Sequence, residues 1–320
     1  MHVNRVSVIV ISYNTRDMTI DCLASVFEQT CRTPFELIVW DNASQDRSAE
    51  AIGERFHSRI SLVAGDSNLG FAVANNRAAE LASGDYLLLL NPDTVVLDGA
   101  IDKLVDVADT HPGAGIWGGR TVFPDGTLNP ASCWQRQTLW SLFCYASGLS
   151  SMFRKSTFFN PEGIGGWNRT GTRYVDIVSG CFLLIRRDMW LSLGGFREEF
   201  FMYGEEADLC LRASKLGAKP IVNSAATIIH YGGASENVRA DKMVRLLKAK
   251  RLLINLHFTD LTKNIGGQLF FLWPVTRYLS HSVLAALGRT SSIDKRDVWR
   301  EIVRRRKEWF DLEAQKRIAG

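Results

Sequence analysis

Three groups of polar side chains in this chain have types and spacings suited to chemistry. Asn91-Pro92-Asp93 directly follows a run of four leucines, and Ser12-Tyr13-Asn14 follows the apolar residues 6–11. A third group, Glu205-Glu206-Ala207-Asp208, places three carboxylates within four residues. Carboxylates that follow buried strands are suitable oxygen ligands for a hard cation. The combination predicts a site that holds a nucleotide diphosphate through a divalent cation and uses a second carboxylate as a base.

These groups can meet only if the elements that carry them share one edge of a fold. Up to about residue 115, short apolar segments alternate with amphipathic ones over short connections. This alternation predicts an α/β fold, with a mostly parallel, Rossmann-like sheet flanked by helices. Strands are expected at 6–12, 35–41, 60–65, 85–90, 175–186 and 219–229, and helices at 17–29, 43–56, 70–83, 98–109 and 205–216.

Polar residues follow each of the first four predicted strands. In open parallel sheets, ligands bind outside the carboxyl ends of the strands. One such Asp would usually cap a helix, but four polar clusters at four strand ends favour a binding site. The sequence contains neither GxGxxG after its first strand nor GxxxxGK[ST], which argues against dinucleotide-dependent and P-loop enzymes. The clusters are Ser12-Tyr13-Asn14, Asp41-Asn42, Asn68 with the residues after it, and Asn91-Pro92-Asp93.

Taken together, these segments resemble the family 2 glycosyltransferases of the GT-A fold, in their bacterial rhamnosyltransferase-like branch. The resemblance covers roughly residues 5–238, and it rests on all of the segments jointly. They are Val8–Asn14, Val39–Asp46, Asn68–Asn76, Leu89–Asp93, Val178–Cys181, Gly194–Phe196 and Phe201–Arg212.

The resemblance implies a division of the chain. A GT-A catalytic domain would occupy residues 1–238, with a nucleotide-binding half at 1–115 and an acceptor-binding half at 116–238. A basic, helical C-terminal extension would follow at 239–320. In the nucleotide half, Asp41 would contact a uracil or thymine base. The nucleotide-binding residues expected from the resemblance are Ser12, Tyr13, Asn14, Asp41, Asn68, Asn76 and Asn91.

The resemblance also implies a metal site. Asp93 would be the last residue of a DxD motif in which Asn91 replaces the first Asp, leaving one firm carboxylate ligand. Diphosphate oxygens and water would complete the shell of Mg²⁺ or Mn²⁺. By the same resemblance, a histidine at the position of His230 would reach the metal, and imidazole is an acceptable ligand for Mn²⁺. A structural role for this single histidine is the alternative.

The acidic cluster is expected to supply the catalytic base. Close carboxylates raise the pKa of at least one member, while a helix N-terminus lowers it. By resemblance the base is Glu206 or Glu205. Glu206 is favoured, although the family more often has Asp there. Asp208 would orient either the acceptor or a neighbouring Arg. Arg197 stands where the family usually has Asp.

The reaction implied is an inverting transfer from dTDP-rhamnose or a UDP-sugar to a hydroxyl of a cell-surface glycan or lipid-linked acceptor. One base opposite the leaving group suffices for this displacement, and no covalent intermediate is needed. A non-catalytic sugar-nucleotide sensor or membrane-associated scaffold is the alternative, although a sensor needs no base. A nucleotidyltransferase is weaker still, because the loop at 14–17 lacks the basic, Gly-rich character such enzymes need.

Charge is distributed unevenly. Residues 1–238 hold 20 Lys and Arg against 26 Asp and Glu, whereas residues 239–320 hold 18 against 8. Arg277 and Pro274 interrupt the apolar segment at 264–288, so a transmembrane helix is not expected. The extension either lies on a membrane surface, with Arg304-Arg305-Arg306-Lys307 near anionic lipid, or forms a helical cap or homodimer contact. No motif indicates nucleic-acid binding.

The six cysteines form no CxxC pair and no zinc spacing, which is typical of a reducing cytosol. The N-terminal residues lead directly into a strand and lack a signal-peptide pattern. We therefore expect a cytoplasmic protein, at the cytoplasmic face of the membrane if the extension binds lipid.

Overall fold

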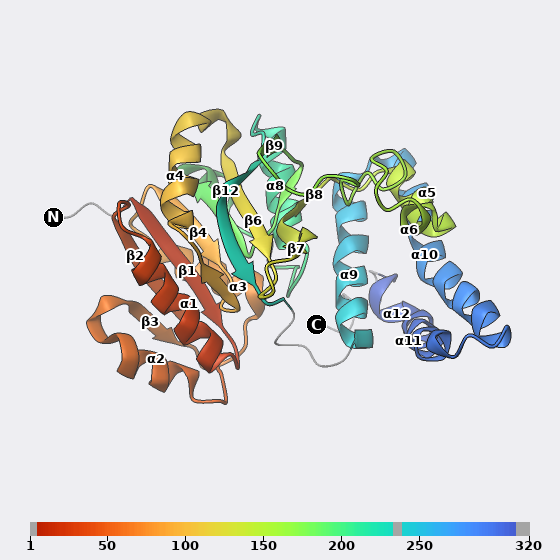
Figure 1. Cartoon of the computed structure of the whole chain (residues 1–320), viewed down its shortest axis with the longest axis horizontal. Coiled ribbons are helices and arrows are strands. Elements are labelled where there is room, and N and C mark those ends of the chain that lie inside the picture. The colour runs from red at the N-terminus through yellow and green to blue at the C-terminus, as the bar shows by residue number, and fades with distance from the viewer. Residues whose placement is uncertain (1–4, 233–238, 312–320) are drawn as a thin grey trace. The chain divides into compact units, whose positions relative to one another are not determined.

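The computed structural model describes residues 5–232 and 239–311, which form two compact units (Figure 1). Of these residues, unit 1 holds 5–134, 168–201 and 205–232, and unit 2 holds 135–167, 202–204 and 239–311. Residues 135–167, which we expected within the catalytic domain, group instead with the C-terminal helices. The assignment of separate nucleotide and acceptor halves stays a prediction.

A mixed ten-stranded sheet forms the centre of unit 1 in the described part of the chain. Its strands are β1 (Val6–Ser12), β2 (Phe35–Asp41), β3 (Ser61–Ala64), β4 (Tyr86–Leu90), β5 (Thr94–Val96), β6 (Ile116–Val122), β7 (Leu128–Asn129), β9 (Thr172–Tyr174), β11 (Phe182–Arg186) and β12 (Ile221–His230). The order is β3-β2-β1-β4-β11-β6-β12-β5, and the first four strands pair in parallel. β11 is antiparallel to both its neighbours, β4 and β6.

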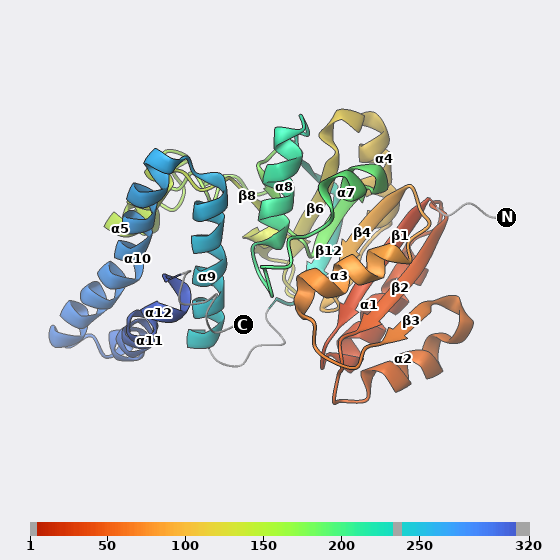
Figure 2. The same cartoon turned by 180° about the vertical axis from the view of Figure 1, so that it is seen from behind.

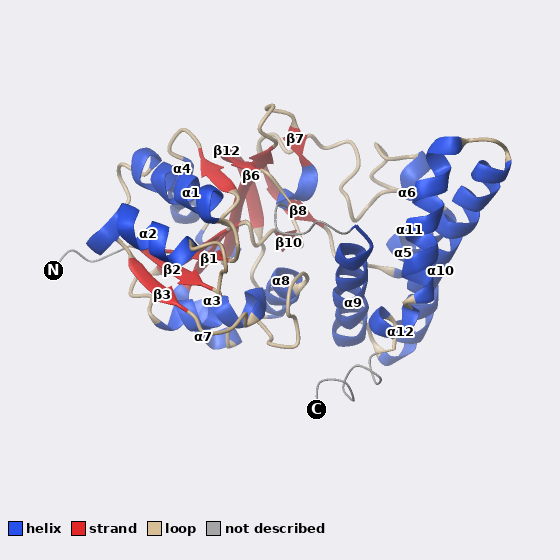
Figure 3. Cartoon of the chain, turned by 90° about the horizontal axis from the view of Figure 1, so that it is seen from below, coloured by secondary structure: helices blue, strands red, loops and turns tan. Residues whose placement is uncertain are grey.

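Helices cover both faces of this sheet, as expected for the α/β class. Figure 3 shows α1 and α4 on one face and α3, α7 and α8 on the other, and Figure 2 shows the latter three in front of the sheet. β1 is buried along its whole length, because its apolar residues meet helices on both sides. The helices of this unit are α1 (Arg16–Gln29), α2 (Ser48–Phe56), α3 (Gly70–Glu80), α4 (Ala100–Thr110), α7 (Arg187–Leu193) and α8 (Glu205–Lys215).

The single strand predicted at 175–186 is wrong. β10 (Ile177–Val178) pairs with β8 (Cys133–Trp134) in a separate two-stranded sheet, whereas β11 joins the main sheet. The chain leaves one sheet and enters the other at the turn Ser179–Cys181. The Ser179 N–H donates to the Ser132 carbonyl at 2.9 Å, and the Cys181 carbonyl accepts from the Asn91 N–H at 3.1 Å. Apolar periodicity does not distinguish one long strand from two short ones.

One buried carboxylate fastens α4 to the loop before β2. Asp102 is 4% exposed and accepts backbone N–H bonds from Cys31 at 3.0 Å and Thr33 at 2.9 Å, with Arg32 between them. Burial by itself would raise the pKa of Asp102, but these hydrogen bonds lower it. Its stabilising effect is therefore present above the unfolded-state pKa and is lost as the pH falls through the folded-state value.

Asp102→Ala is expected to lower the free energy of unfolding by about 3 kcal/mol at neutral pH, because three backbone N–H groups, one of them on the buried Thr33, lose a charged acceptor. Urea unfolding of the two proteins at pH 7 and near pH 3 measures this difference. The difference should shrink at the lower pH, because the unfolded wild-type chain binds a proton at Asp102 there and must release it to fold with an ionised carboxylate. An equal difference at both pH values would contradict the role of the charge.

Unit 2 is helical, in agreement with the expected C-terminal extension. Its helices are α5 (Leu139–Ser147), α6 (Leu149–Met152), α9 (Arg239–His257), α10 (Asp260–Ala286), α11 (Ile293–Arg304) and α12 (Arg306–Trp309). Phe270 and Trp309 are fully buried at the centre of its core and meet edge to face. Lys250 of α9 forms an ion pair with the buried Glu162, which joins residues 135–167 to the C-terminal helices. No described helix combines the length and apolar character needed to cross a membrane.

Candidate active site

The segment Asn91–Asp93 lies where β4 ends and β5 begins. The Asn91 N–H donates to the Cys181 carbonyl at 3.1 Å, and the Thr94 hydroxyl donates to the Asn91 carbonyl at 2.7 Å. β5 pairs with β12 so that Thr94 lies opposite His230. This strand pairing explains why Asp93 and His230, which are more than 130 positions apart in the sequence, become neighbours.

Asp93 and His230 form a largely buried pair. His230 Nε2 lies 3.3 Å from Asp93 Oδ1, and the Gly232 N–H donates to Asp93 Oδ2 at 3.1 Å. Burial would raise the pKa of Asp93, but the hydrogen bond and charge of His230 lower it. For His230 burial has the opposite effect and would lower the pKa, but Cys181 and Asp93 raise it. The pair therefore favours an ionised carboxylate at the expected metal position.

The side chains here are of the type that a hard cation binds, but they form only part of a coordination shell. Among the described residues, no three His, Cys, Asp or Glu side chains come close enough to hold a metal ion by themselves. Asn91 Oδ1 is buried and has no hydrogen-bond partner in the described part of the chain. One carboxylate and one amide oxygen therefore fit a cation that takes most of its ligands from a diphosphate and water, and His230 can join them only when its ring has lost its proton.

The loops after β1 and β2 are locked together. Asn14, which has a left-handed backbone (φ 53°), accepts the Gln45 N–H at 2.7 Å and donates its own N–H to Ser44 Oγ at 2.9 Å. Asp41 Oδ2 accepts the Ser44 N–H at 3.0 Å. Asp41 Oδ1 is buried and lacks a partner among the described residues. One acceptor atom at the end of β2 thus remains for a ligand.

The other two expected members of the β1 turn differ in exposure. Ser12 is buried, with Oγ 3.1 Å from Thr19 Oγ1, so its hydroxyl is used inside the fold. Tyr13 is 37% exposed at the same turn. Of these two side chains, only Tyr13 lies at the surface, where a ligand could contact it.

Asn42 connects two of the strand ends, although we predicted no individual role for its side chain. Asn42 Nδ2 donates to Asn68 Oδ1 at 2.8 Å, and Asn42 Oδ1 accepts the Leu69 N–H at 3.0 Å. Asn68 Oδ1 also accepts the Gly70 N–H at 2.9 Å, where α3 begins. Its position directly after Asp41 was the only signal in the sequence. These hydrogen bonds of Asn42 and Asn68 hold the start of α3 beside the end of β2.

Asn76 lies away from this group of strand ends. Asn76 Nδ2 donates to the Phe196 carbonyl and Oδ1 accepts the Phe196 N–H, both at 2.9 Å. Gly195 has φ +68°, and a Cβ there would lie 2.5 Å from Asn76 Oδ1. The carboxamide therefore holds the turn at Gly194–Phe196, and its placement does not support the expected contact with a nucleotide.

Asp208 is likewise occupied within the fold. Its side chain is fully buried, with Oδ2 2.6 Å from Arg212 Nε and Oδ1 3.3 Å from Arg197 Nε. Arg212 in turn donates to the carbonyls of Leu193 and Gly195, each at 2.7 Å. This placement supports the second of its two expected roles, the orientation of a neighbouring Arg. It also gives Arg197 a structural contact.

Glu206 differs from its acidic neighbours in what it faces. Glu205 is 4% exposed, whereas Glu206 is half-buried. A Cβ placed on Gly180 would lie 3.6 Å from the Cβ of Glu206 and 3.6 Å from the Phe71 ring. The turn that contains Gly180 also contains Cys181, which binds Asn91. The turn Ser179–Cys181 therefore lies between the start of α8 and the strand end at Asn91, a link that the sequence alone did not reveal.

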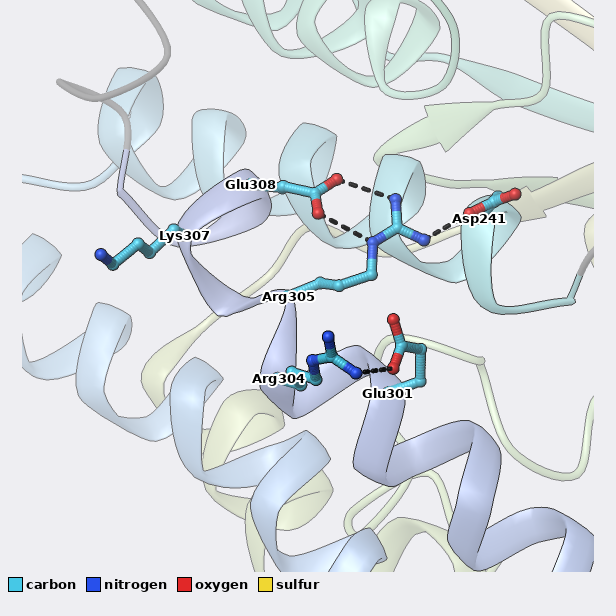
Figure 4. A pocket seen from close by; sticks show the side chains of 6 residues that line it. All are labelled: Asp241, Glu301, Arg304, Arg305, Lys307 and Glu308. Carbon is cyan, nitrogen blue, oxygen red and sulfur yellow. Dashed lines mark hydrogen bonds and ion pairs between the residues drawn. The ribbon is translucent and has the colours of Figure 1, made fainter.

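A separate pocket in unit 2 contains none of the predicted site residues (Figure 4). Arg305 forms ion pairs with Glu308, at 2.8 Å, and with Asp241, and Arg304 lies 3.7 Å from Glu301. These charges neutralise one another and join α12 to α9. Two of the four cations expected to meet lipid, Arg304 and Arg305, are thus paired within the protein.

The fold and site define the class of the protein. The sheet flanked by helices on both faces, with helices after it, is the GT-A-type fold that the sequence predicts. Residues 7–190 match the family described as Glycosyl transferase family 2, and the chain belongs to this family.

Curated relatives support the rhamnosyltransferase-like branch. The chain is 34% identical over 193 residues to Rhamnosyltransferase WbbL of Escherichia coli (strain K12), covering 55% of this chain and 67% of that protein. It is 29% identical to the N-acetylglucosaminyl-diphospho-decaprenol L-rhamnosyltransferase of Mycobacterium tuberculosis, over 65% of this chain and 70% of that one. The O-antigen biosynthesis protein RfbC of Myxococcus xanthus is 29% identical over 74% of this chain, which spans only 18% of that protein.

Solved structures agree with the fold. A mannosyltransferase from Pyrobaculum calidifontis, in complex with GDP-Man and Mn²⁺, aligns over 98% of this chain and 89% of its own, with a TM-score of 0.62 and 16% identity. TarS from S. aureus in complex with UDP aligns over 86% of this chain and 72% of its own, with a TM-score of 0.51 and 17% identity. At such identities the likeness concerns the fold alone.

Proposed function

We propose that this chain transfers a sugar, with inversion, from a pyrimidine nucleotide diphosphate donor to a hydroxyl of a lipid-linked glycan acceptor. The observation that carries the proposal is the turn Ser179–Cys181, in which a Cβ on Gly180 would lie 3.6 Å from the Cβ of Glu206 and the Cys181 carbonyl accepts the Asn91 N–H. This arrangement supports a site in which the proposed base and the proposed diphosphate-binding strand end lie on either side of one turn. The names of the M. tuberculosis and E. coli relatives favour a rhamnosyl donor, and the former favours a lipid diphosphate acceptor.

Donor recognition would begin at Asp41. Uracil and thymine each carry one ring N–H, and the buried Asp41 Oδ1 is an acceptor with no partner in the described part of the chain. A buried acceptor that gains a donor on binding contributes both affinity and selectivity. Guanine presents a different edge and a larger ring. We therefore expect Asp41 to favour dTDP- and UDP-sugars.

Asp93 would hold Mg²⁺ or Mn²⁺ at the diphosphate, with His230 and Asn91 as further ligands. Such an ion, when bound, neutralises charge on the diphosphate as it leaves. The Gly232 N–H holds one carboxylate oxygen of Asp93 in place, which orients the side chain. Because the protein supplies few ligands, we expect metal affinity to be weak until the nucleotide is present.

Glu206 would act as the base. It accepts the proton of the acceptor hydroxyl while the acceptor oxygen bonds to the anomeric carbon. The bond between that carbon and the diphosphate oxygen breaks at the same time, and the nucleoside diphosphate leaves with the electron pair. A single displacement of this kind inverts the anomeric configuration, and no covalent intermediate on the protein is required.

A donor panel tests the proposal. Thermal shift and donor hydrolysis are measured with dTDP-rhamnose, UDP-N-acetylglucosamine, UDP-glucose and GDP-mannose, each with Mn²⁺, Mg²⁺ or EDTA. We expect stabilisation by pyrimidine donors in the presence of a divalent cation, and weaker or no stabilisation by GDP-mannose. Absence of any response to pyrimidine donors, or a response to GDP-mannose alone, would refute the donor assignment.

A further inference from the structure

The long helix α10 of unit 2 has an apolar side that faces away from its own core. Five apolar residues on it, and Leu287 directly after it, are 45% to 82% exposed, although most surface helices carry polar residues there. At 100° per residue their spacing confines them to about 80° of the helix circumference. No exposed residue between the first and last of them is charged. This stripe consists of Leu261, Ile265, Leu272, Leu279, Val283 and Leu287.

The stripe is additional to the face that α10 buries. Gly266, Phe270 and Pro274 are buried, and Phe270 packs against Trp309 in the core of unit 2. In Figure 1, α10 runs along the edge of this unit on the side away from α9. At 1.5 Å per residue the stripe is about 40 Å long. Exposed apolar surface of this extent marks a site of interaction with another molecule or a membrane.

Positive charge gathers at the C-terminal end of the stripe. Burial and three neighbouring cations lower the pKa of His281. These cations are Lys295, Arg277 and Arg289. Neither Lys295 nor Arg289 forms an ion pair with a carboxylate among the described residues. Residues 135–167 and 239–311 together hold 19 Lys and Arg against 8 Asp and Glu, a net charge of +11.

The segment packed on α10 adds exposed aromatic side chains. The Thr276 hydroxyl of α10 donates to the Ala146 carbonyl of α5 at 2.7 Å, which fixes α5 beside the helix. Trp140 and Phe143 of α5 stack with a centroid distance of 5.5 Å and are 38% and 43% exposed. Phe158, 62% exposed, lies 4.8 Å from Trp140 between ring centroids. Trp and Phe are favoured residues at the boundary between lipid headgroups and acyl chains.

We propose that α10 is an interfacial helix whose apolar stripe inserts into the surface of an anionic lipid bilayer. The charge of the unit favours lipid over a second copy of this chain, because two units of +11 would repel each other. An interfacial helix buries its apolar face about 5–10 Å into the headgroup boundary, and nearby Lys and Arg residues meet anionic headgroups. The surface does not depend on the proposed donor chemistry, but it would bring the enzyme to a lipid-linked acceptor.

Co-sedimentation of the full chain with vesicles tests this proposal. The vesicles contain phosphatidylcholine alone or equal parts of phosphatidylcholine and phosphatidylglycerol. We expect binding to the anionic vesicles that weakens with salt. Leu272→Gln/Leu279→Gln should lower it at least about tenfold through the loss of apolar burial. Arg289→Gln/Lys295→Gln should lower it by roughly tenfold or more on anionic vesicles, because each cation near the surface contributes about a fivefold factor.

The matched control is Leu191→Gln/Leu216→Gln, which changes two leucines of unit 1 that are 59% and 62% exposed. It should leave vesicle binding unchanged. Hydrogen exchange of residues 261–287 in the wild-type chain, with and without vesicles, gives a second readout that needs no variant. Donor hydrolysis in solution is measured in parallel, so that a failure of the catalytic proposal is seen separately.

Two outcomes would overturn the lipid proposal. One is a wild-type chain that binds anionic vesicles no better than neutral ones and shows no protection of α10. The other is a dimer in light scattering that the stripe variant dissociates, which would assign the stripe to a second copy. A stripe variant that loses vesicle binding but keeps its melting temperature and donor hydrolysis supports it.

Discussion

Glu206→Gln is expected to lower kcat by about a thousandfold while leaving the affinity for the donor unchanged. Glutamine has the same shape as glutamate, so the placement of residue 206 near the turn at Gly180 is preserved. Glutamine cannot accept the proton of the acceptor hydroxyl, so only the rate of the chemical step should fall. Steady-state kinetics with an acceptor measures the first effect, and calorimetric titration with donor measures the second.

Glu205→Gln separates the two candidates for the base. Glu205 is nearly inaccessible, whereas Glu206 is half-buried beside the turn Ser179–Cys181. We expect the Glu205 variant to lose mainly stability. Glu199→Gln is the control, because Glu199 lies on the preceding loop and its side chain is 60% exposed beside Arg197. Normal turnover in the Glu206 variant, with loss in the Glu205 variant, would move the base to Glu205.

The local pattern of apolar and polar residues was sufficient to predict the first strands of the sheet. β1 and β2 begin and end at the predicted residues, because each is a short apolar run followed directly by polar residues. Parallel strands bring their carboxyl ends to one edge, so the strand-end positions of Asp41 and Asp93 could be predicted before any coordinates. The turn Ser179–Cys181 could not be predicted in this way. The chain passes there from the two-stranded sheet to the main sheet, and the residues on both sides of the turn are equally apolar.

Long-range pairing explains the other differences. Asn76 lies only eight positions after Asn68, yet its partner is Phe196, which no local pattern indicates. Asp208 resembles its acidic neighbours in sequence, but the side chain points to Arg212 and Arg197 instead of an open site. Polar residues on one short segment thus divide between the fold and the candidate site. Sequence spacing alone does not decide which residue goes where.

Asp93→Ala is expected to remove the dependence of donor binding on a divalent cation and to lower kcat/KM by at least about 100-fold. Asp93 is the one carboxylate at the strand end, and the other expected ligands are a neutral amide and an imidazole. Calorimetric titration of UDP and dTDP, with Mn²⁺ and with EDTA, gives the result without turnover. In the wild-type chain Mn²⁺ should strengthen binding, whereas in the variant the two conditions should give the same affinity.

The same substitution also leaves His230 and the Gly232 N–H without their acceptor, so some loss of stability is expected, of about 1–3 kcal/mol. Asp102→Ala is the matched control, because Asp102 is another buried carboxylate that accepts backbone N–H groups. It should lose stability to a similar degree and keep the response to Mn²⁺. If both variants keep that response, Asp93 is a structural partner of His230, and the metal must be held by other groups or be unnecessary. If only the Asp93 variant loses it, the carboxylate at the end of β4 acts on the donor through the cation.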